Sequence, residues 1–210
     1  MSVTNLIKLV KKVKESDVKH IIESRIAEFK NIGSKSSEEI FKELCFCILT
    51  ANFDAAKCIM IQRRIGRGFI ELPEKELAIK LKELGHRFPN TRAKYISLAR
   101  KHKEFLATLF SSSFDDNEIR EWLVKNIKGV GYKEASHFLR NIGYKNCAII
   151  DFHIIDLLVK HKIIRKPSSI SKKKYLEIES ILREMSNRLK LTPAELDLYL
   201  WYIETGNVLK

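Results

Sequence analysis

The stretch NIKGVGYKEASHFLRNIG, residues 126–143, places two glycines one residue apart, directly before a helical pattern. Gly129 and Gly131 permit a tight turn with positive backbone angles at little steric cost. Because a helix follows at once, several backbone N–H groups point outward and form an anion site suited to a phosphate. With helices expected at 115–126 and 132–142, the stretch predicts a helix-hairpin-helix. The alternative is an ordinary connection between antiparallel helices.

The rest of the chain is also predicted to be helical. It has only 8 glycines and 4 prolines in 210 residues and no convincing period-two strand pattern. Capping-box sequences predict helix starts at Ser36, Asp115 and Thr192. Further helices are expected at 16–31, 54–65, 74–84, 91–110, 151–161 and 171–190. The prediction is an all-α, two-lobed protein with a central bundle over 36–125, the hairpin motif over 126–150, and a second lobe built from 1–35 and 151–210.

The charge of the chain indicates an anionic partner. Lys and Arg number 39 against 26 Asp and Glu, a formal net charge of +13, and nucleic acid fits this excess better than solubility alone. A hairpin that binds phosphates holds DNA without reading its sequence. No apolar run approaches the roughly 18 residues of a membrane span, and the N-terminus lacks a signal-peptide core. A cytoplasmic, DNA-associated protein without membrane contact is therefore expected.

The four cysteines indicate neither a metal site nor an iron–sulfur cluster. They contain no C-x-x-C pair and no C-terminal quartet, and three lie in apolar helical runs, which favours buried free thiols. They are Cys45, Cys47, Cys58 and Cys147.

Lys133 and Asp151 stand 18 residues apart and can meet in space. The helix over 132–142 rises about 15 Å, and the extended chain from Gly143 to Asp151 can return roughly 26 Å. A lysine nucleophile must be unprotonated, and partial burial, nearby cations and a helix N-terminus all disfavour the ammonium form. Lys133 could instead be one surface lysine among many. Asp151 could be an N-cap, which is compatible with facing a cleft.

The segments IKGVGYKEA (127–135) and CAIIDFHIIDLL (147–158) together resemble the signature of the helix-hairpin-helix DNA glycosylases. The chain departs from it at Lys128, where proline is usual, and in a turn before Asp151 that is poorer in Gly and Pro. The resemblance implies an active site in the cleft between lobes. Lys133 would attack the anomeric carbon, expel the base and hold the sugar as a Schiff base, while Asp151 would stabilise the developing positive charge. A lysine here further implies strand nicking by β-elimination.

The C-terminal segment TPAELDLYLWYIETGNVLK, residues 192–210, resembles the type-2 8-oxoguanine DNA glycosylases of archaea and bacteria. The resemblance implies that the α-carboxylate of Lys210 enters the base pocket and that Trp201 stacks on the flipped base. It assigns a second stacking aromatic to Phe88. Without it, Trp201 would be read as core filling and Lys210 as a frayed terminus.

The same resemblance implies contacts with double-stranded DNA. Asn52 would insert as a polar wedge, and His153 would contact the DNA backbone, although taken alone it could be a surface or core histidine. The hairpin residues Gly129, Val130 and Gly131 would bind a phosphate. In relatives, hairpin carbonyls can hold a monovalent or calcium ion, and residues 125, 127 and 130 would supply them here. Arg87, Arg92 and Lys94 are further candidates for phosphate contacts.

The sequence thus predicts a monomeric DNA repair enzyme that excises 8-oxoguanine and then nicks the abasic strand. Two alternatives stay open. The chain could be a non-catalytic helix-hairpin-helix module that only binds DNA, or the same kind of enzyme acting on oxidised pyrimidines.

Overall fold

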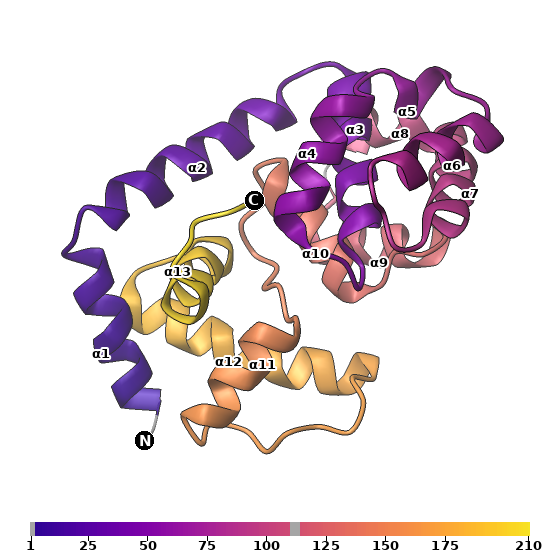
Figure 1. The fold of residues 1–210 in the computed structure, drawn as a ribbon. Coiled ribbons are helices and arrows are strands. Elements are labelled where there is room, and N and C mark those ends of the chain that lie inside the picture. The colour runs from indigo at the N-terminus through magenta and orange to yellow at the C-terminus, as the bar shows by residue number, and fades with distance from the viewer. Residues whose placement is uncertain (1–2, 110–113) are drawn as a thin grey trace.

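The computed structural model describes residues 3–109 and 114–210, and within these ranges helices are the only regular elements (Figure 1). Their bounds are α1 Val3–Lys14, α2 Val18–Gly33, α3 Ser37–Thr50, α4 Ala55–Ile65, α5 Gly68–Glu71, α6 Glu74–Glu83, α7 Pro89–Ala99, the 3-10 turn η1 Arg100–His102, α8 Lys103–Leu109, α9 Asp116–Asn126, α10 Tyr132–Asn141, α11 Phe152–Lys160, α12 Lys172–Leu189 and α13 Pro193–Thr205. The all-α prediction is confirmed.

The helices pack around two hydrophobic cores. The first core contains buried side chains from Ile40 to Cys147, contributed by helices from α3 to α10 and by the segments on either side of α10. It defines the first lobe. The second core combines side chains of α1 and α2 with those from Ala148 to Leu200, including α11, α12 and α13, and is called the second lobe. Figure 1 shows α2 running from the second lobe toward the first. The exact division into domains stays a prediction.

Two of the three predicted capping boxes are present. The Asp115 carboxylate accepts from Glu118 N at 2.9 Å while Asp115 N donates to the Glu118 side chain, and Thr192 and Glu195 repeat the pattern at α13. The box predicted at Ser36 is wrong. The N–H of Glu39 bonds the Ser36 carbonyl oxygen instead, and the Glu39 carboxylate pairs with Lys42.

The helix predicted over 91–110 is divided. Helix α7 ends at Ala99, a 3-10 turn follows, and α8 begins at Lys103. The side chain of Arg100 leaves this turn to donate to the carbonyl oxygens of Phe69 and Leu72, at 2.9 and 2.6 Å. The predicted last residue, 110, lies outside the described residues.

No helix within the described ranges is long and apolar enough to cross a membrane. All four cysteines are free and buried, as the sequence predicts. The chain therefore offers two helical lobes, with the segment between α10 and α11 passing from one core to the other.

Candidate active site

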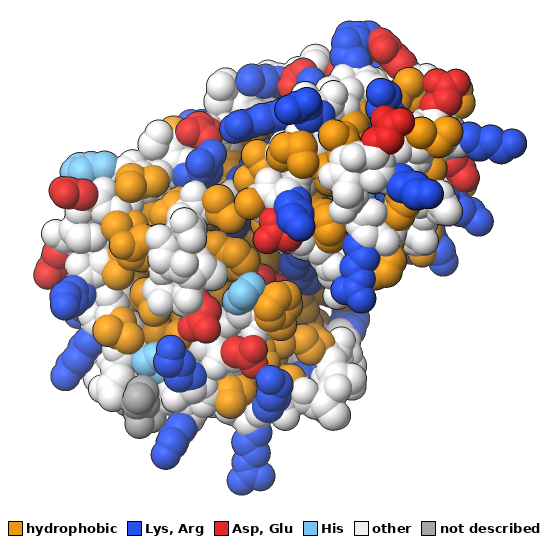
Figure 2. All heavy atoms as spheres, viewed as in Figure 1, with side chains coloured by type: hydrophobic (Ala, Val, Ile, Leu, Met, Phe, Trp, Pro, Cys, Tyr) orange, Lys and Arg blue, Asp and Glu red, His pale blue; other side chains and the backbone are white. Residues whose placement is uncertain are grey.

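A cavity of about 700 Å³ lies between the lobes and is lined from both. Figure 2 shows the molecule hollowed between its two parts, with apolar side chains on the walls and Lys and Arg side chains around the opening. Its size falls in the range of small-molecule and cofactor pockets, roughly 300–1,000 Å³. The lining residues are Thr50, Asn52, Phe53, Asp54, Ala55, Ala56, Arg87, Lys133, Glu134, His137, Arg140, Ile149, Asp151, Phe152, His153, Asp197, Trp201, Leu209 and Lys210.

Lys133 and Asp151 both line this cavity, so the structure brings together the two residues that the sequence paired. Lys133 lies in the first turn of α10, and 23% of its side chain is exposed. Its ammonium nitrogen is 3.9 Å from Glu134 Oε1. Asp151 is the N-cap of α11, where its Oδ1 accepts from Ile154 N at 3.0 Å. Asp151 therefore caps a helix and faces the cavity at the same time. The catalytic roles of the pair stay predictions.

The hairpin before Lys133 uses only one of its two glycines for a positive backbone angle. Gly129 has φ +83°, whereas Gly131 has φ −97° and ψ −172°, so the expectation for Gly131 is wrong. A Cβ on Gly129 would lie 2.1 Å from Tyr95 Cδ2. The N–H of Gly131 donates to Glu134 Oε2 at 3.2 Å. The Glu134 carboxylate thus already occupies a position at this helix N-terminus, where negative charge is favoured.

Three of the charged and polar side chains that line the cavity, His137, Arg140 and Asp197, are almost fully buried. Arg140 of α10 pairs with Asp197 of α13, and both are at most 6% exposed. Burial raises the pKa of Asp197 to about 6; the positive charge of Arg140 opposes this rise and the negative charge of Asp151 adds to it. Burial, aided by the positive charges of Arg140 and Lys133, holds the pKa of His137 well below its usual value. His137 is therefore a neutral imidazole at ordinary pH.

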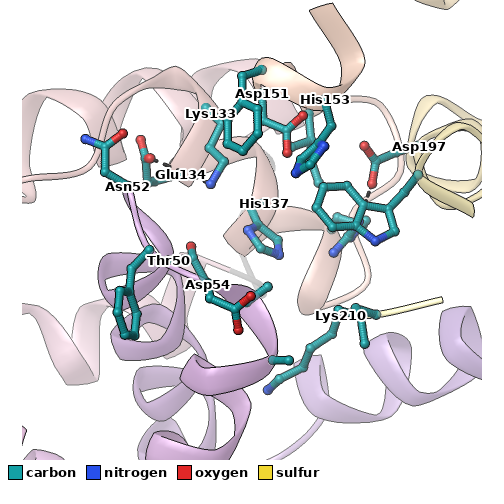
Figure 3. Close-up of a pocket in the computed structure, with 18 of the residues that line it drawn as sticks. Thr50, Asn52, Asp54, Lys133, Glu134, His137, Asp151, His153, Asp197 and Lys210 are labelled. Carbon is teal, nitrogen blue, oxygen red and sulfur yellow. Dashed lines mark hydrogen bonds and ion pairs between the residues drawn. The ribbon is translucent and has the colours of Figure 1, made fainter. Parts of the chain in front are cut away.

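Of the three residues predicted to recognise the base, two line the cavity and one does not. Trp201 and Lys210 line the cavity, and the buried Nε1 of Trp201 makes no hydrogen bond. Figure 3 shows Lys133 and Asp151 at one end of the cavity, His137 in the middle and Lys210 at the other end. Phe88 is not among the lining residues; its ring lies 5.1 Å from the Arg87 guanidinium. The phenyl rings that do line the cavity are Phe53, from the first lobe, and Phe152, next to Asp151.

The residues predicted to contact DNA also differ in whether they line the cavity. Asn52 and His153 line the cavity, and Asn52 has φ +58°, a left-handed conformation at the end of α3. Arg87 lines the cavity too, and Lys94 is exposed. Arg92 is only 7% exposed and donates to the Ala51 carbonyl oxygen, so it is occupied within the first lobe.

The lining residues that sequence reasoning missed include His137, Asp197 and Phe53. His137 follows Lys133 by four residues and Asp197 precedes Trp201 by four. Residues four apart share a helix face, so this spacing is a signal that could have found both. Phe53 follows Asn52 in the loop between α3 and α4, and no periodicity marks it.

The two lobes, the glycine hairpin and the cleft between them are the architecture of the helix-hairpin-helix glycosylases. The family model described as 8-oxoguanine DNA glycosylase matches residues 22–191, and the chain belongs to this family. A relative from Korarchaeum cryptofilum, named 8-oxoguanine DNA glycosylase/AP lyase, is 56% identical over 211 residues, covering 100% of both chains.

Two solved structures are also closely similar. The Methanocaldococcus jannaschii 8-oxoguanine glycosylase/lyase in complex with a 15mer DNA containing 8-oxoguanine superposes with a TM-score of 0.94. Its chain is 54% identical, and the match covers 98% of this chain and 99% of that one. The 8-oxoguanine DNA glycosylase of Thermotoga maritima gives a TM-score of 0.93 at 44% identity, covering 99% and 100%.

Proposed function

We propose that this chain is a DNA repair enzyme that removes 8-oxoguanine from double-stranded DNA and then nicks the resulting abasic strand. Relatives that match this chain over nearly their whole lengths are named 8-oxoguanine DNA glycosylase/AP lyase. The single observation that carries the proposal in this chain is the cavity that Lys133, Asp151, Trp201 and Lys210 line together. A nucleophile, a carboxylate, an aromatic face and a terminal carboxylate are what base excision through a covalent intermediate requires.

Binding of the duplex would begin with the positive charge of the chain, which attracts the phosphate backbone irrespective of sequence. The hairpin Gly129–Val130–Gly131 would then hold a phosphate, and His153 would contact the backbone beside the cavity. Asn52, at the end of α3, would fill the gap left by the base that rotates out of the stack. The extruded base would enter the cavity and stack on Trp201, a contact worth about 1–3 kcal/mol.

Base excision would be carried out by Lys133 and Asp151. The unprotonated amine of Lys133 attacks C1′ of the damaged nucleotide, and the bond from C1′ to the base breaks with its electron pair going to the base. Asp151 stabilises the positive charge that develops on the sugar and assists the proton transfers. The C1′–O4′ bond then breaks and opens the sugar ring, with its electron pair going to O4′, which takes up a proton. The Lys133 nitrogen loses a proton and is left joined to C1′ as a Schiff base. Loss of a proton from C2′ expels the 3′ phosphate, which nicks the strand.

Recognition of the lesion would use the α-carboxylate of Lys210, which can accept two hydrogen bonds from the Watson–Crick edge of a guanine ring. Oxidation adds a donor at a ring nitrogen that is an acceptor in guanine, so a further acceptor must read that proton. We propose in addition that the protein acts as a monomer in the cytoplasm, where its substrate lies.

Borohydride trapping tests the proposal. A duplex containing 8-oxoguanine should give a covalent adduct with the wild-type chain and none with Lys133→Gln. Lys82→Gln, an exposed lysine of α6, is the matched control and should still be trapped. Duplexes with oxidised pyrimidines should give little adduct. Tight binding to the lesion duplex without any adduct would make the chain a DNA-binding module, and preferential trapping on an oxidised pyrimidine would change the substrate.

A further inference from the structure

A carboxylate buried in the first lobe contacts Lys210, one of the residues that line the cavity. Glu43 of α3 is 3% exposed and lies among the apolar side chains of that helix. Its carboxylate accepts hydrogen bonds from Lys210 Nζ at 2.8 Å, from Asn141 Nδ2 at 2.7 Å and from Gln62 Nε2 at 3.2 Å. A buried charge is costly unless it is paired and hydrogen-bonded. Glu43 is therefore matched to the side chain of the last residue of the chain.

The ammonium group of Lys210 is enclosed on several sides. It pairs with Glu43, donates to Gln62 Oε1, and lies 4.3 Å from the ring centroid of Phe46. Only 14% of the Lys210 side chain is exposed. Chain termini are usually poorly ordered unless something holds them. Here a buried ion pair with Glu43, a hydrogen bond to Gln62 and the ring of Phe46 hold the terminal residue to α3 and α4.

The side-chain ammonium and the main-chain carboxylate of Lys210 lie in different places. Figure 3 shows its side chain running away from His137 and Asp151. A backbone group of Lys210, by contrast, is close enough to His137 to act on the pKa of that cavity residue. The side chain thus points into the first lobe while the main chain stays at the cavity wall.

We propose that Glu43 is a positioning residue for base recognition. By holding the Lys210 ammonium, it fixes the α-carboxylate of Lys210 at the place where that carboxylate meets the flipped base; this rests on the proposed function. The Glu43 carboxylate is also connected to α13 through hydrogen bonds. It accepts from Asn141, whose side-chain oxygen accepts from Arg140, and Arg140 pairs with Asp197 of α13. One buried group therefore sets both the terminal carboxylate and the helix that carries Trp201.

The test compares two steps that need different parts of the cavity. Excision of 8-oxoguanine requires the base to be recognised, whereas nicking of a preformed abasic site requires Lys133 but offers no base to recognise. Glu43→Gln keeps the shape of the side chain and removes its charge. We expect single-turnover excision to fall by about tenfold or more, since misplacement by an ångström can cost about a hundredfold. Nicking of the abasic site should stay within about twofold of wild type.

Two further variants separate positioning from general stability. Glu179→Gln removes the charge from another buried ion pair, the one with Arg120, and any effect should fall on excision and nicking alike. Lys210→Met removes the ammonium and keeps the terminal carboxylate, so it should reproduce the loss of Glu43→Gln. The double variant Glu43→Gln/Lys210→Met should then be no worse than either single one. Lys210→Met also keeps the proposal testable if Glu43→Gln does not fold.

The outcomes that overturn each claim differ. An excision-to-nicking ratio that is unchanged in Glu43→Gln and Lys210→Met, or losses that add in the double variant, would overturn the positioning role alone. A wild-type chain that nicks abasic sites but leaves 8-oxoguanine in place would overturn the proposed function itself.

Discussion

The imidazole of His153 meets the indole of Trp201 edge to face, with ring centroids 4.7 Å apart and planes inclined by 76°. His153 follows Asp151 by two residues in the first turn of α11, and Trp201 belongs to α13. The ring predicted to stack on the base is therefore supported by a side chain next to the predicted catalytic carboxylate. The sequence predicts that His153 contacts the DNA backbone. Its packing against the indole indicates that it also orients Trp201.

Replacing His153 by alanine should disturb the orientation of Trp201. An aromatic pair contributes about 0.5–1.5 kcal/mol, so we expect single-turnover excision of 8-oxoguanine to fall by up to about tenfold. His153→Phe keeps an aromatic ring against the indole and should retain most of the excision rate. DNA affinity, measured by fluorescence anisotropy, reports the backbone contact separately. Equal excision losses in both variants would argue against the packing role.

Asp151 caps α11 and is predicted to be a catalytic carboxylate, and two substitutions separate these functions. Asparagine caps a helix as well as aspartate does, whereas alanine costs about 1 kcal/mol. Both Asp151→Asn and Asp151→Ala should lower excision by about a hundredfold or more. Only Asp151→Ala should also lower the melting temperature, by about 2–4 °C. Substantial excision by Asp151→Asn would remove this residue from the proposed chemistry.

The two hairpin glycines should respond differently to alanine. Gly129 has a positive φ, and an added Cβ would collide with the Tyr95 ring, so Gly129→Ala should destabilise the fold by about 2 kcal/mol or more and weaken DNA binding. At Gly131 the added Cβ would meet only Glu134 Oε2, at 3.3 Å, and that flexible side chain can move. Gly131→Ala should therefore cost less than about 1 kcal/mol. Thermal unfolding and DNA titration of both variants check the difference.

The features that could be predicted from the sequence are local. Capping boxes at Asp115 and Thr192 are read from four neighbouring residues, and the hairpin is read from glycine spacing before a helical pattern. The placement of Lys133 and Asp151 in one cavity followed from the rise of a helix and the reach of an extended return. At Ser36 the same local rule failed, because Lys42 competes for the Glu39 carboxylate.

The features that could not be predicted depend on contacts between distant segments. Glu43 lies in an apolar helical run, and its burial is explained by partners 19, 98 and 167 residues later in the chain. Phe88 and Phe53 are both aromatic residues before a helix, and nothing in either segment says which one faces the cavity. Family resemblance supplied roles for Trp201 and Lys210 that no periodicity could supply.

The buried carboxylate of Asp197 should give stability a measurable pH dependence. Its pKa rises from 3.8 to about 6 in the folded protein, chiefly through burial. The folded state thus binds this proton more tightly than the unfolded chain, so the stabilisation is fully present below pH 3.8 and is lost as pH rises through about 6. Relative to Asp197→Asn, the wild type should gain on the order of 1–3 kcal/mol of unfolding free energy between about pH 7 and pH 4. Urea titrations at both pH values measure the difference, and a constant difference would show that the pKa of Asp197 is not raised.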